Sequence, residues 1–170
     1  MMTGCAGQRP NPSTTPPGAG SPSQGSLLKP TSVPQVFVIP AGIPEWQRRL
    51  LMDVNEQKNE LETLYIFTSQ ELAMINRGQI RNDFPYPLDL SEFYEIKANY
   101  AKDLASLEPR QRGAIYAFYG TLAQINSYQL QRESLPYRHY SNVPQQVQTL
   151  DQLILSEIAA ARSVDFSWIQ

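Results

Sequence analysis

Apolar residues recur at intervals of three and four along the stretch from Ile43 to Gly78, which is the spacing of one face of an α-helix. Pro44 suits a first helical residue, because its missing N–H would have no partner there. Gly78 suits a left-handed helix end. The apolar face predicts a helix over 44–77, and its members are Ile43, Trp46, Leu50, Val54, Leu61, Leu64, Thr68, Leu72 and Ile75.

This predicted helix leaves two points open. As one piece it would span about 51 Å, whereas the next helix would span only about 28 Å. The run from Thr68 to Glu71 fits a capping box, so the sequence allows either a continuous helix or a break near Thr68.

The turn from Asn55 to Glu60 is polar all round. Either this turn faces solvent, or Gln57 is hydrogen-bonded inside the protein, because a buried polar group without a partner is costly. Asp53, Glu56 and Glu60 form an acidic stripe at helical spacing. The stripe is explained by a solvated helix face; a basic partner or a calcium ion is the functional alternative.

Three further helices follow from the same spacing. The first covers 89–107, and Asp89 and Glu92 resemble a capping box at its start. The second runs from about Pro109 to Ser134, and the third from Pro144 to about Val164. The predicted core positions of the three are Phe93, Ile96, Tyr100, Leu104 and Leu107; Ile115, Phe118, Leu122 and Ile125; and Val147, Leu150, Ile154, Ile158 and Ala161.

Two features beside these helices need a reason. Gly113, Ala117 and Gly120 form a stripe of small residues, although a helical glycine costs about 1 kcal/mol relative to alanine. We expect close approach of another helix or an extended segment there, with a ligand groove as the alternative. The apolar chain end, with Phe166, Trp168 and Ile169, is either docked in the core or an exposed hook for a partner.

The N-terminal part is different in composition. Residues 6–32 are mostly Pro, Ser, Thr, Gly and Gln, so we expect a disordered tether over 1–32 and a folded domain over 33–170. Residues 33–40 contain Val36 to Ile39 between prolines, which predicts a short extended apolar strap lying against the helices. The predicted fold is all-α: an antiparallel bundle of about four helices with this strap.

Charge and residue types limit the chemistry. All 16 acidic residues and all but two of the 14 Lys and Arg follow residue 32, so the folded part carries a net charge of −4. This argues against nucleic-acid binding, which needs clustered cations. His139 and Cys5 are the only residues of their types, which excludes paired-histidine metal sites and makes Cys–His catalysis unconvincing. We therefore expect no enzymatic activity, metal, cofactor or small-molecule substrate.

The segment Met2-Thr3-Gly4-Cys5 resembles the lipobox of bacterial lipoproteins, and a Pro/Ser-rich tether follows it, as in that class. The resemblance implies lipid attachment at Cys5, and Ala6 after it resembles the pattern of outer-membrane sorting. It further implies a periplasmic cell-envelope protein that binds or positions parts of a larger assembly. The alternative is a cytosolic or virion structural adaptor with a flexible N-terminal arm, in which Cys5 is a free thiol.

Two loops place tyrosine beside proline, and tyrosine and arginine are the residues that most often anchor protein interfaces. If the first helix is continuous, both loops lie at the same end of an up-down bundle. The sequence therefore predicts one partner-binding patch; the alternative is that these aromatic residues plug the end of the bundle. The candidate residues are Phe84, Tyr86, Tyr137, Arg138 and Tyr140.

Overall fold

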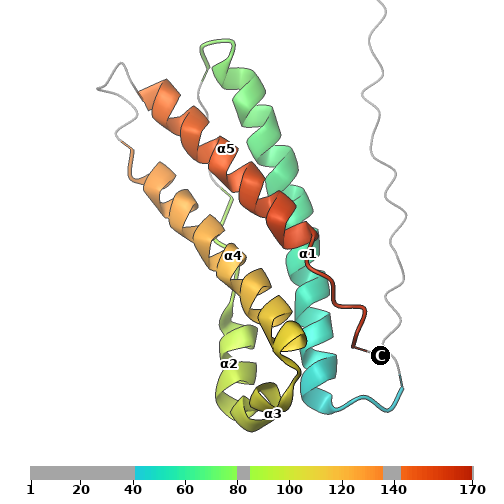
Figure 1. Cartoon of the computed structure of the whole chain (residues 1–170). Helices are drawn as coiled ribbons and strands as arrows, with labels where there is room; N and C mark the ends of the chain where they lie inside the picture. Colours follow the sequence, from blue (N-terminus) through green and yellow to red (C-terminus); the bar gives the residue numbers. More distant parts are fainter. Residues whose placement is uncertain (1–40, 80–84, 136–142, 170) are drawn as a thin grey trace, which may run out of the picture. The chain divides into compact units, whose positions relative to one another are not determined.

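The computed structural model describes residues 41–79, 85–135 and 143–169, and these form an all-α bundle (Figure 1). Within these ranges there is no β-strand. The predicted tether and the strap at 33–40 lie outside the described residues, as do Cys5, Phe84, Tyr137, Arg138 and Tyr140.

The long helix α1 spans Glu45–Ile75 without interruption, so the break near Thr68 does not occur. Thr68 is buried, and Glu71 points into the core instead of capping a new helix. The helix ends as predicted: Gly78 has a φ of +75°, and its N–H bonds to the carbonyl of Ile75 at 2.8 Å. At 31 residues, α1 runs about 46 Å, the full height of the bundle.

The second leg of the bundle is not the single helix predicted over 89–107. It begins as a non-helical stretch over 85–90 and continues as α2 (Ser91–Asn99) and α3 (Ala101–Ser106), with Tyr100 as the bend between them. The predicted capping box at its start does not form either. Glu92 instead binds Arg49 of α1 through two hydrogen bonds of 2.6 and 2.9 Å, and Asp89 accepts the N–H of Ser91 at 2.9 Å.

The remaining legs are α4 (Pro109–Glu133) and α5 (Val143–Arg162). Glu108 and Gln111 form a true capping box at the start of α4. Helices α1 and α4 run in one direction, and α5 runs back against both (Figure 1). The antiparallel bundle is therefore confirmed, with the second leg part helix and part non-helical chain.

The core follows the predicted apolar faces closely. The predicted apolar face of α4 is fully buried. The chain end is docked in the core, which was one of the two alternatives, because Phe166 is 7% and Ile169 is 5% exposed. Five of the predicted core residues are only partly buried: Ile43, Leu72, Tyr100, Leu107 and Leu150. Beside two of them, Leu72 and Leu150, the neighbouring carboxylates of Glu71 and Asp151 are buried instead. No helix among the described residues is long and apolar enough to cross a membrane.

Leu104→Ala tests whether short α3 is part of the core. Leu104 is 2% exposed, so we expect the free energy of unfolding to fall by about 2–5 kcal/mol in a urea titration. Leu130→Ala is the control, because Leu130 is 57% exposed and should change stability by less than about 0.5 kcal/mol. A loss below about 1 kcal/mol for Leu104→Ala would contradict the packing of α3.

Candidate protein-interaction surface

A non-helical segment inside a helical bundle must find partners for its backbone groups, and here side chains of two helices supply them. Asn126 of α4 pairs with Leu88 twice: it accepts the Leu88 N–H and donates to the Leu88 carbonyl, both at 2.8 Å. Gln57 of α1 donates to the carbonyl of Asp89 at 2.5 Å. We call residues 85–90 the clamped segment, because side chains of α1 and α4 bind its backbone at Leu88 and Asp89 while Leu88 and Leu90 are buried.

Tyr86 projects from the clamped segment into solvent, with 93% of its surface exposed. Pro85 and Pro87 flank it, and proline restricts the backbone on both sides. A shallow groove of about 180 Å³ lies beside the ring, with Glu60, Thr63 and Leu64 of α1 along its other wall. An exposed aromatic side chain thus lies on a fixed backbone next to a shallow groove.

Tyr86 is not a plug for the end of the bundle, because its ring is almost fully exposed. The groove places it beside the middle of α1, whereas α4 ends and α5 begins at the far end of the bundle (Figure 1). Its proposed neighbours Phe84, Tyr137, Arg138 and Tyr140 lie outside the described residues. The single patch of five residues therefore stays a prediction, with only Tyr86 placed.

The acidic stripe of α1 divides into an inner and an outer part. Asp53 is buried, 6% exposed, and accepts hydrogen bonds from Tyr119 at 2.5 Å and from Gln57 at 3.3 Å. Gln57 is 2% exposed, so the inside alternative for this polar turn is correct and a wholly solvated face is not. Burial raises the pKa of Asp53, although both hydrogen bonds act to lower it.

Glu60 is the outer part and lines the groove beside Tyr86. Partial burial raises the pKa of Glu60, and the negative charges of Glu56, Asp89 and Asp53 raise it further. A carboxylate in this position is stabilised by any cation that approaches. The groove therefore suits a partner that brings a lysine or arginine next to the Tyr86 ring.

A second buried polar group ties the other half of the bundle together. Arg132 of α4 is 0% exposed and forms ion pairs with Glu71 of α1 and, at 3.3 Å, with Asp151 of α5. Burial raises the pKa of Asp151 to about 7, although the positive charge of Arg132 lowers it. One arginine faces two buried carboxylates, so protonation of Asp151 leaves a neutral set. The triad was not predicted from the sequence, in which Glu71 fits a capping box and apolar spacing gives no signal for Arg132 or Asp151.

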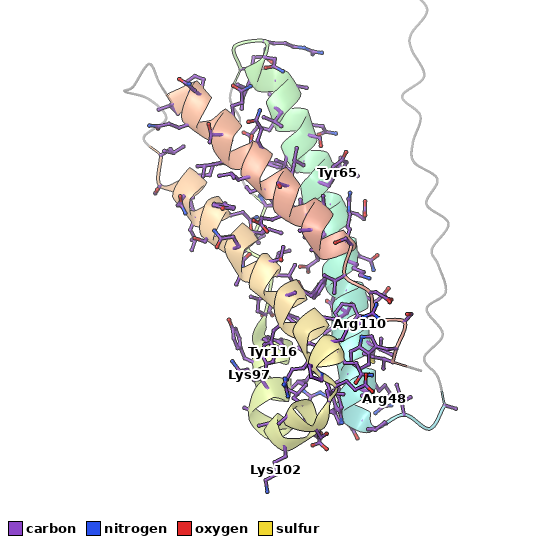
Figure 2. The ribbon with its side chains drawn as sticks, in the orientation of Figure 1. Arg48, Tyr65, Lys97, Lys102, Arg110 and Tyr116 are labelled. Carbon is purple, nitrogen blue, oxygen red and sulfur yellow. The ribbon has the colours of Figure 1, made fainter. Side chains whose placement is uncertain are left out.

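Aromatic side chains connect the surface of α2 to the chain end. Phe93 stacks on Tyr119 at 3.9 Å, and Phe118 joins Tyr119 to Phe166, with ring centroids 5.2 and 5.3 Å away. At one end of this series Tyr116 is 42% exposed, and the Lys97 ammonium lies 5.7 Å from its ring (Figure 2). The series holds α2, α4 and the chain end in one cluster.

The described residues hold no group of three or more His, Cys, Asp or Glu side chains placed to bind a metal ion. Comparisons of the chain with protein-family models, curated proteins and solved structures give no match.

The pKa of Asp151 predicts a stability that depends on pH. Between about pH 4 and pH 7 the folded protein keeps this proton and the unfolded chain loses it, so stability falls as the pH rises. Asp151→Asn removes the effect. We expect the wild type, relative to the variant, to lose roughly 1–3 kcal/mol of unfolding free energy between pH 5 and pH 8. A difference that is constant with pH would show that Asp151 is already ionised in the folded state at pH 5.

Proposed function

We propose that this protein is a non-enzymatic structural subunit of a bacterial cell-envelope assembly, held at the membrane by a lipid on Cys5 and bound to another protein through Tyr86. The observation that carries the protein-binding part is the 93% exposed tyrosine on a clamped backbone. Fixing a binding residue before the partner arrives lowers the entropy lost on association.

The chemistry of the partner follows from the groove. The phenol ring offers a large apolar face with a hydrogen-bonding tip, and the wall behind it carries Glu60. A partner surface with an apolar cavity for Tyr86 and a lysine or arginine beside it satisfies both features. The lipobox-like N-terminus supports placement on the periplasmic face of the outer membrane.

A photo-crosslinking residue at position 86 of the full chain tests the partner site. In the source organism we expect one discrete protein adduct from position 86 and none from position 94, because Tyr94 is also an exposed tyrosine (56%) but lies on α2. The adduct should vanish in Glu60→Lys, which reverses the charge in the groove. Equal adducts from both positions would mean that Tyr86 is merely accessible.

The double variant Tyr86→Ser plus Tyr137→Ser separates binding from stability. The proposal requires the purified adduct partner to lose affinity at least tenfold, while the melting temperature changes by less than about 2 °C. A melting temperature many degrees lower would show that a substituted tyrosine is a packing residue. Unchanged affinity would remove both positions from the binding site.

Lipid attachment has a separate test. The natural gene product should partition into the detergent phase of a Triton X-114 extract and carry a mass increase on the peptide that contains Cys5. Cys5→Ser should move the protein to the aqueous phase. The same variant should still form the photo-crosslinked adduct from position 86 with the purified partner. An aqueous wild-type protein with an unmodified Cys5 would favour the adaptor with a flexible arm.

A further inference from the structure

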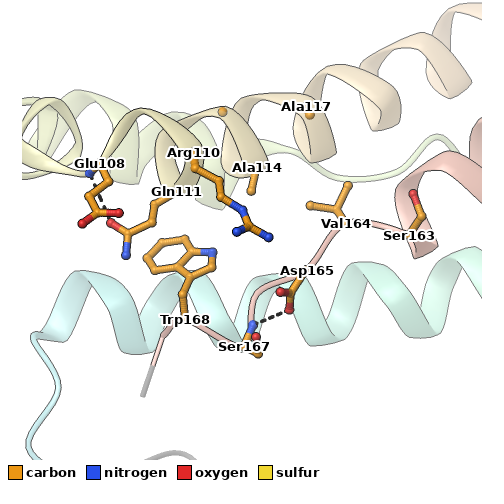
Figure 3. A pocket seen from close by; sticks show the side chains of 11 residues that line it. Glu108, Arg110, Gln111, Ala114, Ala117, Ser163, Val164, Asp165, Ser167 and Trp168 are labelled. Carbon is orange, nitrogen blue, oxygen red and sulfur yellow. Dashed lines mark hydrogen bonds between the residues drawn. The ribbon is translucent and has the colours of Figure 1, made fainter.

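A wide groove runs between the first half of α4 and the chain end after α5 (Figure 3). Its volume is about 590 Å³, more than three times that of the depression beside Tyr86. Gly113, Ala114 and Ala117 of α4 form one wall, and Val164 and Trp168 form the other. Two residues of the predicted stripe of small residues, Gly113 and Ala117, therefore line this groove, whereas Gly120 does not.

The groove is open because α4 has no side chains there to fill it. A Cβ atom added at Gly113 would meet no other atom within 4 Å among the described residues, so no described helix approaches the stripe. The expected helix–helix contact is thus absent from the described part of the protein. A glycine at this position still costs the helix about 1 kcal/mol relative to alanine, without a described packing partner in return.

The groove also contains a shielded hydrogen-bond donor. The indole nitrogen of Trp168 is shielded from solvent and has no hydrogen-bond partner among the described residues. Figure 3 shows it turned toward the guanidinium of Arg110, which is itself a donor only. Asp165, which also lines the groove, accepts the N–H of Ser167 at 2.8 Å through one oxygen, and this hydrogen bond and the positive charge of Arg110 both lower its pKa. A shielded donor of this kind requires an acceptor such as a peptide carbonyl.

We propose that the groove is the seat of this chain's own segment Val36–Ile39, bound in an extended conformation. Four consecutive apolar residues are costly to leave in water, and an extended chain carries free carbonyls at every residue. Pro34 and Pro40 on either side keep the segment out of a helix. The small residues of α4 allow its backbone to come close, and Trp168 covers it and donates to a carbonyl.

The path of the chain before α1 supports this occupant over a separate protein. Val36 is five residues from Ala41, where the described structure begins, so it can reach at most about 17 Å from there. Gly42 adopts a φ of +90° in a turn, and the stretch before α1 leads toward the side where the chain end is drawn (Figure 1). Ile43 packs against the same core cluster as Val164 and Trp168.

Disulfide trapping in the full chain tests the contact directly. In a Cys5→Ser background, Val38→Cys with Ala117→Cys should form an intramolecular disulfide in mild oxidant, seen as faster migration without reductant. Val38→Cys with Ala123→Cys is the matched control, because Ala123 is exposed on α4 outside the groove. Equal trapping of both pairs would overturn the proposal. So would disulfide-linked dimers from the first pair, since they would make a second copy the occupant.

Fluorine NMR gives a readout without new cysteines. The chain labelled with 5-fluorotryptophan should give two signals, from Trp46 and Trp168, assigned with Trp168→Phe. Phe37→Asp plus Ile39→Asp should move the Trp168 signal to the position of a solvated indole, and Gln35→Asp should not. An unmoved Trp168 signal in a folded double variant would show that the groove holds something else or nothing.

Discussion

The structure depends on the need to satisfy the backbone of a non-helical segment that lies against the core. The backbone of Leu88 and Asp89 lies before the first turn of α2, so side chains of Asn126 and Gln57 supply its hydrogen bonds. This requirement explains the polar turn in α1. Gln57 faces inward because the clamped segment needs a donor there, and Asp53 beside it accepts hydrogen bonds from Gln57 and from the Tyr119 hydroxyl.

The same constraint decides the shape of the second leg. A full-length helix in that leg would satisfy its own backbone and would give Asn126 nothing to bind. The leg is instead helical only from Ser91 to Ser106, with a bend at Tyr100, and Glu92 is free to bind Arg49 of α1. In one half of the bundle the side-chain amides of Asn126 and Gln57 bind backbone groups of the second leg. In the other half the Glu71–Arg132–Asp151 triad connects three helices.

The triad and the clamp differ in what they contribute. The attraction within a buried ion pair offsets the free energy of desolvating its charges only in part, so the pair is weak evidence for stability. It does restrict the register of α1, α4 and α5, because any slide of one helix would leave a charge buried without its partner. The clamp uses neutral amides, whose burial costs less and whose two-point contact at Leu88 also fixes register.

The sequence was sufficient for the helix faces and the all-α class, because apolar spacing reports which side of a helix is buried. The four predicted core residues of α4 are each 0% exposed. It was insufficient where a polar residue replaces an apolar one in the core. Glu71 is next to Leu72 and Asp151 is next to Leu150, the leucines that were expected in the core. The two carboxylates can be buried because Arg132 on a third helix pairs with both. The clamped segment was not predicted either, because the side chains that bind its backbone, Asn126 and Gln57, are remote in sequence.

Clamping also bears on why Tyr86 is suited to binding. Ordering a free backbone costs roughly 1–2 kcal/mol per residue, and a binding tyrosine on an unrestrained loop incurs that cost at association. Here the cost is met during folding, by the hydrogen bonds of Asn126 and Gln57 and the burial of Leu88 and Leu90. In the proposed complex the phenol ring would then lose only its own side-chain rotations. The buried amides of Asn126 and Gln57 would thus affect binding at the surface, because they fix the backbone that carries the exposed ring.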